Sequence, residues 1–217
     1  MISAVARGLS RPVVLLRQTR NTVSVRAFPL ICNQRCYNRL YLWVNCWTQR
    51  TGAGTLAGMA LLNDSTWMEL ALEQARRAVE LGEVPIGALV TTKEGEVAGR
   101  GHNRNLLDKD PTAHAEIVAL REAAARIGNH RLAGCTVFVT IEPCAMCAGA
   151  MVHARVARLV FGASDPKAGA AGSVLQVINH PQLNHRMEVV SGVLADRCSE
   201  VLQSFFRLKR GPAAFHN

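Results

Sequence analysis

The sequence lacks long apolar runs, and its first 63 residues lack acidic side chains. No apolar stretch approaches the roughly 18 residues that a transmembrane helix needs, which argues against a helical membrane span. Residues 1–63 contain eight Arg but no Asp, Glu or Lys, whereas the rest of the chain has 17 basic and 16 acidic residues. The overall charge of +9 is therefore mostly a property of the N-terminal segment, and it does not by itself indicate that the remainder binds nucleic acid.

The N-terminal segment has three possible interpretations. Met59 could be the natural start, which would make the preceding stretch a mistaken extension of the reading frame. An Arg-rich stretch without acidic residues also resembles an organellar leader, although Ser is scarce in it. Alternatively, it is a basic arm that helps to hold RNA. We expect residues 1–63 to be a disordered basic extension and residues 64–217 to be one globular domain. The expected location is the cytoplasm, or an organelle if residues 1–58 are a leader.

Seven cysteines are present, but a second Cys-x-x-Cys motif is missing, which disfavours a zinc ribbon. The cysteines are also too scattered for the disulfide framework of a small secreted protein. Cys144 and Cys147 lie three residues apart at the start of a predicted helix, so their sulfurs share one face and can converge on one ion. A redox dithiol remains an alternative for this pair alone. Cys135 and Cys198 are interpreted as core residues.

An upstream His-Ala-Glu motif changes the interpretation of this cysteine pair. The order His-x-Glu followed by Pro-Cys-x-x-Cys is the signature of zinc-dependent deaminases. His114, Cys144 and Cys147 can bind zinc and leave one coordination position for water, while Glu116 carries the protons of the reaction. A structural zinc would more often have a fourth protein ligand. The nearest candidate is His153, which lies toward the far end of the predicted helix and is interpreted as a surface or interface residue.

Strand and helix patterns alternate along residues 64–217, which indicates a sheet covered on both faces. Residues 66–69 resemble a capping box, and Gly82 is expected to end the first helix. The turn at residues 93–95 predicts an antiparallel hairpin. The predicted helices are residues 66–81, 113–127, 144–153 and 193–209, and the predicted strands are residues 84–92, 96–102, 135–140 and 157–161.

Residues 66–210 resemble the bacterial tRNA-specific adenosine deaminases. The likeness extends well beyond the zinc signature, which a generic deaminase would share. The chain departs from many relatives at Asn105, where they have Pro. The blocks that carry the resemblance are residues 83–88, 102–104, 110–116, 140–151, 161–163, 167–173, 184–186 and 205–207.

The resemblance implies an α/β fold, namely the three-layer α/β/α sandwich of the cytidine-deaminase type with a five-stranded mixed sheet. It also implies hydrolytic deamination of adenosine to inosine at the wobble position of a tRNA anticodon, with one Zn²⁺ per subunit, in a homodimer. An anticodon loop presents bases that are already out of the stack. In this chemistry Glu116 would take a proton from the attacking water, pass it to N1 of adenine and later help to protonate the departing ammonia.

The same resemblance suggests which residues contact the RNA, although each has a structural alternative. Asn103 would contact the target nucleotide or serve as a turn residue. Asp165 would lie near a ribose hydroxyl, or it forms a turn with the proline that follows it. The remaining candidates for substrate binding are Lys167, Asn184, Phe206 and Arg207. Arg207 could instead belong to a basic helix end that complements the helix dipole.

Two other functions stay open at this point. One is a cytosine, cytidine or guanine deaminase that uses the same metal site on a free base or nucleoside. The other is a noncatalytic RNA-binding zinc module. Glu116 argues against the second, because a structural zinc needs no proton carrier.

Overall fold

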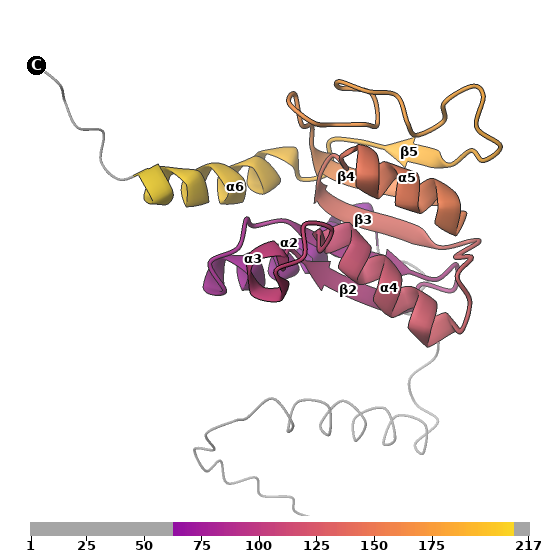
Figure 1. The fold of residues 1–217 in the computed structure, drawn as a ribbon, viewed down its shortest axis with the longest axis horizontal. Coiled ribbons are helices and arrows are strands. Elements are labelled where there is room, and N and C mark those ends of the chain that lie inside the picture. Colours follow the sequence, from indigo (N-terminus) through magenta and orange to yellow (C-terminus); the bar gives the residue numbers. More distant parts are fainter. Residues whose placement is uncertain (1–62, 211–217) are drawn as a thin grey trace, which may run out of the picture. The chain divides into compact units, whose positions relative to one another are not determined.

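The computed structural model describes residues 63–210, so the predictions for residues 1–62 lie outside the described range. Helices and strands alternate along this part of the chain (Figure 1). In chain order the elements are α2 (Asp64–Glu80), β1 (Gly87–Thr91), β2 (Val97–His102), α3 (Asn105–Asp108), α4 (Ala115–Ile127), β3 (Thr136–Ile141), α5 (Ala145–Ala154), β4 (Arg158–Ala163), β5 (Glu188–Val190) and α6 (Ala195–Arg210).

The five strands form one mixed sheet in the order β2-β1-β3-β4-β5. β1 is antiparallel to both of its neighbours, β2 and β3, whereas β3, β4 and β5 are parallel. The predicted hairpin and the five-stranded mixed sheet are therefore confirmed. Three consecutive parallel strands require crossover connections, and α5 provides the one between β3 and β4.

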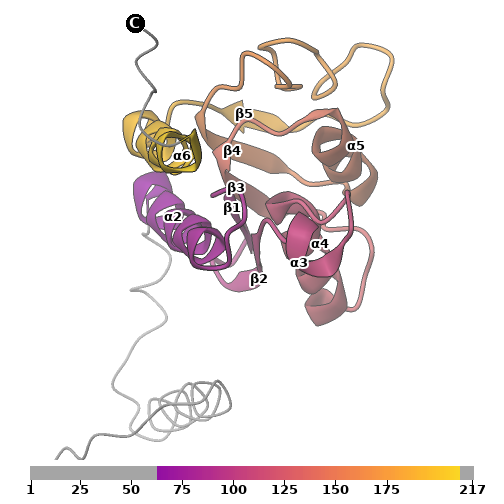
Figure 2. The same cartoon turned by 60° about the vertical axis from the view of Figure 1, so that its left-hand side comes forward.

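Helices cover both faces of the sheet, as Figure 2 shows, with α2 and α6 on one side and α4 and α5 on the other. Because successive side chains of a strand point to opposite faces, each strand contributes to two cores. In β1, Leu89 belongs to the cluster with α2 and α6, and Val90 belongs to the cluster with α4 and α5. The ring of Phe138 in β3 lies 6.1 Å from that of Trp67 in α2. The three-layer α/β/α sandwich is confirmed.

The predicted helix boundaries are close to the observed ones, but the predicted cap of the first helix is wrong. The N-cap is Asn63, whose side chain accepts a hydrogen bond from the backbone N–H of Thr66 at 2.9 Å. Thr66 therefore lies in the first turn rather than before it. Asn and Thr are both common N-cap residues, so composition alone could not choose between positions three residues apart. Gly82, with φ of +75°, follows the end of this helix as expected.

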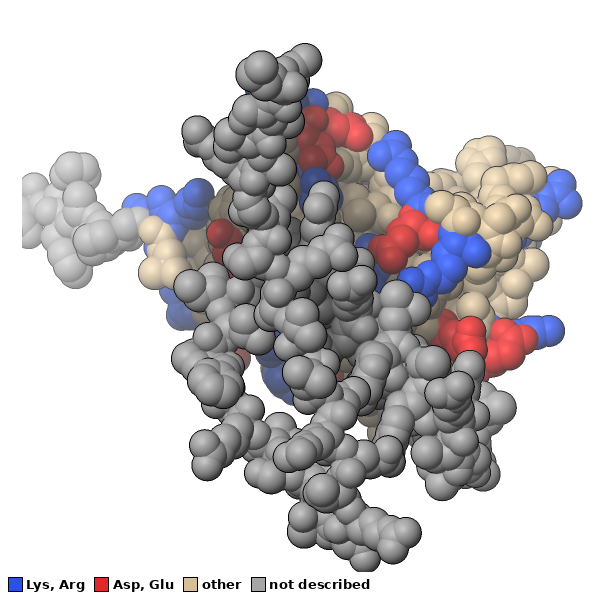
Figure 3. Space-filling view, turned by 90° about the horizontal axis from the view of Figure 1, so that it is seen from below, with Lys and Arg blue, Asp and Glu red and all other residues tan. Residues whose placement is uncertain are grey.

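The described residues carry nearly balanced charge and contain no helix that is both long and apolar enough to span a membrane. All charged residues of 64–217 lie within the described range, so their net charge is the +1 obtained from the sequence. Figure 3 shows acidic and basic side chains close together on the face that it displays. The excess of positive charge thus belongs to the part of the chain that precedes α2.

Candidate active site

Three loops that follow strands meet at one edge of the sheet. β2 and β3 run in the same direction because each is antiparallel to β1, and β4 is parallel to β3. Their carboxyl ends therefore lie at the same edge. The loop after β2 leads into α4, and the short turn after β3 leads into α5. Both helices consequently begin at this edge, which is where α/β proteins commonly bind ligands.

The predicted metal ligands converge at the starts of these two helices. His114 is the N-cap of α4 and Cys144 is the N-cap of α5, while Cys147 lies one turn further along α5 and is fully buried. Nδ1 of His114 lies 3.6 Å from Sγ of Cys144 and 3.5 Å from Sγ of Cys147. All three ligand atoms lie within 4.8 Å of one another. One imidazole and two sulfurs at this spacing can hold a soft divalent metal ion.

Hydrogen bonds and helix N-termini around the cluster favour the thiolate form of Cys144. Hydrogen bonds from Cys147 and His114 lower the pKa of Cys144 to about 3, so that this sulfur is a thiolate. The hydrogen bond with Cys144 in turn raises the pKa of Cys147, as does burial. The hydrogen bond to Cys144 likewise raises the pKa of His114. The N-termini of α4 and α5 add positive potential at the same place, which also favours a thiolate.

Glu116 lies beside this cluster in the first turn of α4 and is 3% exposed. Burial is the main cause that raises its pKa to about 7. Its Oε2 is buried and has no hydrogen-bond partner among the described residues. A buried carboxyl that titrates near neutrality and has an unpaired oxygen beside a metal-type cluster can take up and release a proton.

No fourth protein ligand completes the cluster within the described residues. Within residues 63–210, one group of three or more His, Cys, Asp or Glu side chains could hold a metal ion, and it consists of these same three residues. His153, the nearest candidate from the sequence, is exposed in the last turn of α5, at the opposite end of that helix from Cys144. The cluster is therefore of the open type that leaves room for water or substrate.

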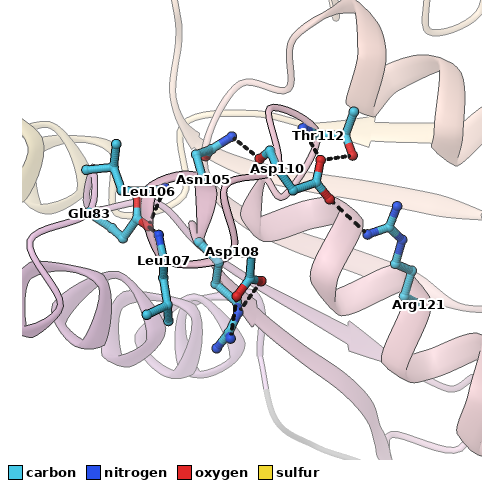
Figure 4. Close-up of polar contacts among 9 residues, drawn as sticks. Glu83, Asn105, Leu106, Leu107, Asp108, Asp110, Thr112 and Arg121 are labelled. Carbon is cyan, nitrogen blue, oxygen red and sulfur yellow. Dashed lines mark hydrogen bonds and ion pairs between the residues drawn. The ribbon is translucent and has the colours of Figure 1, made fainter.

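Asn103 is buried next to the cluster, where it holds the start of α4. It is 5% exposed, and its Oδ1 accepts a hydrogen bond from the backbone N–H of Ala115 at 2.9 Å. Side-chain hydrogen bonds within residues 105–112 stabilise the segment that follows, as Figure 4 shows. Asp110 accepts hydrogen bonds from the N–H and hydroxyl of Thr112, and Nδ2 of Asn105 donates to the carbonyl of Asp110. This loop presents both Asn103 and His114 in fixed positions.

A pocket of about 650 Å³ adjoins the carboxyl ends of β3 and β4. Asp165, Lys167 and Phe206 line it, so the structure brings these three predicted residues together. Oδ1 of Asp165 accepts hydrogen bonds from the backbone N–H of Lys167 at 2.9 Å and of Ala168 at 3.2 Å, which is the turn that its composition suggested. Phe206 belongs to α6 and is 42% exposed at the pocket.

Asn103, Asn184 and Arg207 do not line this pocket, and neither do the side chains of the metal-type cluster. Nη2 of Arg207 donates to the hydroxyl of Ser204 at 2.9 Å, and Arg207 does not line the pocket. Asn184 accepts hydrogen bonds from Nη1 of Arg155 through both its backbone carbonyl, at 3.1 Å, and its side-chain oxygen, at 2.9 Å. Arg155 is the C-cap of α5, so this contact lies at the end of α5 opposite from Cys144.

Two buried carboxylates near the site were missed in the sequence. Oε1 of Glu83 accepts hydrogen bonds from the N–H groups of Leu106 and Leu107, both at 2.8 Å, and so holds α3 (Figure 4). Glu142 accepts hydrogen bonds from the loop that begins at Asp165. Both residues lie inside blocks that carry the family resemblance, but their partners are more than 20 residues away in sequence. No local pattern could have indicated these contacts.

Comparisons with known proteins agree with the geometry of the site. A family model of MafB19-like deaminases matches residues 62–210. The tRNA-specific adenosine deaminase of Haemophilus influenzae is 50% identical over 147 residues, which cover 68% of this chain and 85% of that protein. The tRNA-specific adenosine deaminase of Bacillus subtilis is 44% identical over 147 residues, with coverages of 68% and 91%.

Solved structures with the same fold include two kinds of deaminase. One, from a study of A-to-I editing by tRNA:A34 deaminases at the wobble position, is 45% identical with a TM-score of 0.61, and the match covers 63% of this chain and 98% of that one. The guanine deaminase of Nitrosomonas europaea is 26% identical with a TM-score of 0.56, and the coverages are 67% and 85%. Sequence identity over most of the domain thus places this chain with the first kind: it belongs to the family of tRNA-specific adenosine deaminases.

Proposed function

We propose that this protein converts adenosine to inosine at the wobble position of a tRNA anticodon and releases ammonia. The observation that carries the proposal is the open cluster of His114, Cys144 and Cys147 with Glu116 buried beside it. The choice of adenosine in tRNA is supported by 44–50% identity to deaminases of that specificity, compared with 26% to a guanine deaminase.

Zinc is the metal that suits this donor set. Tetrahedral zinc with ordinary Zn–N and Zn–S bonds separates a nitrogen from a sulfur ligand by about 3.6 Å. The two distances from Nδ1 of His114 to the sulfurs, 3.6 and 3.5 Å, match this value. When bound, zinc would lower the pKa of a water molecule in the remaining coordination position toward neutrality. The unpaired Oε2 of Glu116 leaves an acceptor available for a proton from that water.

Glu116 then carries protons between the attacking water and the base. It accepts a proton from the water as the oxygen forms a bond to C6, and it delivers that proton to N1 of adenine. The remaining proton of the water passes by the same carboxylate to the exocyclic nitrogen. The bond between C6 and that nitrogen breaks, ammonia leaves, and C6 becomes the carbonyl of inosine. A carboxyl that is buried, and whose pKa lies near 7, is suited to both directions of transfer.

The residues around the cluster would orient the RNA. Asn103 lies beside the metal ligands, and its contact with the target nucleotide is part of the proposal. Asp165, Lys167 and Phe206 adjoin the pocket that opens at the same edge of the sheet, where nucleotides flanking the target would lie. Arg207 and Asn184 remain proposed RNA contacts, supported by the family resemblance. A homodimer is proposed on the same basis, and sedimentation of the purified protein would measure it.

The test uses the purified full chain and a tRNA with adenosine at the wobble position. We expect inosine at that position by mass spectrometry of nuclease fragments, with one ammonia released per inosine formed and about one zinc per chain. Free guanine and free cytidine should release no ammonia. Turnover of guanine without editing of tRNA would instead support the guanine deaminase alternative. Zinc binding without turnover of any substrate would support the noncatalytic module.

A further inference from the structure

Glu142 is a buried carboxylate that takes no part in the proposed reaction. It lies between the end of β3 and the turn that contains Cys144, and it is 2% exposed. Its Oε1 accepts hydrogen bonds from the backbone N–H groups of Ala171 at 2.9 Å and Ser173 at 3.0 Å. Its Oε2 accepts one from the N–H of Asp165 at 3.1 Å and one from the hydroxyl of Ser173. Both oxygens are thus used by one loop, residues 165–173.

The loop also packs closely against the turn that carries the metal ligand. The N–H of Ala170 donates to the carbonyl of Pro143 at 2.9 Å, and Gly169 forms an isolated bridge with Cys144. A Cβ atom at Gly169 would lie only 2.5 Å from Cδ and Oε2 of Glu142. Glycine is therefore needed at this position for the carboxylate to approach the loop.

We propose that Glu142 is a positioning residue that fixes the loop 165–173 relative to the metal centre and thereby sets the affinity for the RNA around the target base. The loop carries Asp165 and Lys167, which line the pocket at the carboxyl ends of β3 and β4, and it meets Cys144 through the bridge at Gly169. A buried carboxylate without hydrogen-bond donors has a high free energy. The donors of the loop therefore stabilise the Glu142 carboxylate, and the carboxylate in turn holds the loop in place. The inference rests on the proposed function, because it assigns the loop a role in binding the anticodon.

Replacing Glu142 with Gln tests this contact with little change of volume. The Gln oxygen can accept from Ala171 and Ser173 in place of Oε1, but its NH₂ group then faces the N–H of Asp165, and both are donors. The hydroxyl of Ser173 can rotate to accept a hydrogen bond, whereas a backbone N–H cannot. The substitution should therefore release the end of the loop that contains Asp165.

The experiment compares the loop and the RNA affinity in the zinc-loaded full chain. In the inactive E116Q background, adding E142Q should raise the Kd for an anticodon stem-loop by about tenfold, the cost of one lost hydrogen bond to a charged group. Amide hydrogen exchange of residues 165–173 should accelerate. In the active background, E142Q should raise KM by a similar factor and change kcat much less. Zinc content should remain about one per chain.

Two further variants control the result. Gly169→Ala reaches the same contact from the loop, and it should reproduce the rise in Kd and the faster exchange. Glu122→Gln changes a carboxylate that accepts a backbone N–H, from Arg100, far from the loop, and it should leave both measurements unchanged. Unchanged loop exchange in E142Q would overturn the inference. Faster exchange with an unchanged Kd, or loss of zinc without faster exchange, would overturn it as well. If the wild-type chain forms no inosine, the proposed function fails, and the exchange measurement still decides whether Glu142 holds the loop.

Discussion

Glu116 differs from the other carboxylates near the site in having a buried oxygen without a partner. Glu83 and Glu142 are equally buried, but both accept hydrogen bonds from backbone N–H groups and so stabilise loops. A buried carboxylate oxygen that is left unpaired destabilises the fold, and a catalytic role is one reason why a protein retains such a group. This contrast supports the proposed proton transfer by Glu116 and the proposed positioning role of Glu142.

Replacing Glu116 with Gln should abolish catalysis while leaving the metal centre intact. Gln has nearly the same shape but cannot accept and return a proton, so we expect kcat for inosine formation to fall at least about 100-fold. Zinc content should stay near one per chain, because Glu116 is outside the ligand cluster. Single-turnover inosine formation and atomic absorption measure the two quantities. Loss of zinc in this variant would contradict the assigned role and make Glu116 a ligand.

Gly101 in β2 lets α4 approach the sheet, and a substitution there should disturb the metal centre. A Cβ at this position would lie 2.0 Å from the carbonyl oxygen of Ala115, the first residue of α4. Gly101→Ala must therefore push α4 outward, at a cost of about 1–3 kcal/mol or more in the free energy of unfolding. Because His114 precedes α4, zinc affinity should fall as well. Denaturant unfolding and a zinc-indicator competition measure these effects.

Gly149 in α5 provides the matched control. A Cβ there would meet no atom within 4 Å, so Gly149→Ala should leave stability unchanged or raise it by up to about 1 kcal/mol through helix propensity. If Gly101→Ala and Gly149→Ala lowered the free energy of unfolding equally, the close approach of β2 to α4 would not be the cause of the destabilisation.

The short helix α3 depends on a carboxylate from outside its own segment. Both hydrogen bonds from Leu106 and Leu107 reach Oε1 of Glu83, as Figure 4 shows. Glu83→Ala leaves two N–H groups without their acceptor, which should destabilise the fold by about 1–3 kcal/mol and accelerate amide exchange in residues 105–108. Glu83→Gln retains one oxygen at this place and should cost much less. Equal effects of the two variants on thermal unfolding would mean that the charge, rather than the acceptor, matters.

The ion pair between the start of α2 and β4 should make stability depend on acidic pH. Two hydrogen bonds of 2.7 Å join Arg158 to Asp64 and lower the pKa of Asp64 below its ordinary value of 3.8. A group with a lowered pKa in the folded state stabilises fully above its unfolded pKa and loses this effect as the pH falls further. Asp64→Asn should therefore cost about 1–2 kcal/mol at pH 7 and progressively less below about pH 4.

Urea unfolding of wild type and Asp64→Asn at pH 7 and pH 3 measures this difference. Glu73→Gln, on the exposed side of the same helix, should leave unfolding unchanged at both values. A cost of Asp64→Asn that stays constant between pH 7 and pH 3 would exclude the ion pair as its source.

The longer elements could be predicted because their patterns are local, whereas the two shortest could not. β5 has three residues and begins with an exposed Glu188, and α3 has four residues held by Glu83, so neither has enough sequence to show a period. The cluster of His114, Cys144 and Cys147 could be predicted because it is encoded in two short motifs at the starts of α4 and α5. The contact of Asn184 with Arg155 joins residues 29 apart, and no pattern near Asn184 indicates it.

The cluster that could hold a metal ion brings together residues from two separate segments of the domain. His114 comes from the loop after β2, near the edge of the sheet, and Cys144 and Cys147 come from the segment after β3. Their convergence depends on α4 and α5 packing on the same face of the sheet (Figure 2). A metal ion bound there would cross-link these segments in the folded state only, so its binding energy would add to the stability of the domain.

Removal of the metal should therefore lower the unfolding temperature of the entire domain. Zinc sites can contribute several kcal/mol, and a domain of this size changes its Tm by about 2–4 °C per kcal/mol, so a strong chelator should lower Tm by roughly 10 °C or more. Cys147→Ala should unfold at a low Tm that the chelator no longer changes. Cys198→Ala is the control, since Cys198 is a buried cysteine in the α2 and α6 core. It should lose some stability through its cavity but keep the response to chelator. Scanning calorimetry with and without chelator separates these cases, and a full chelator response in Cys147→Ala would place the stabilising metal at another site.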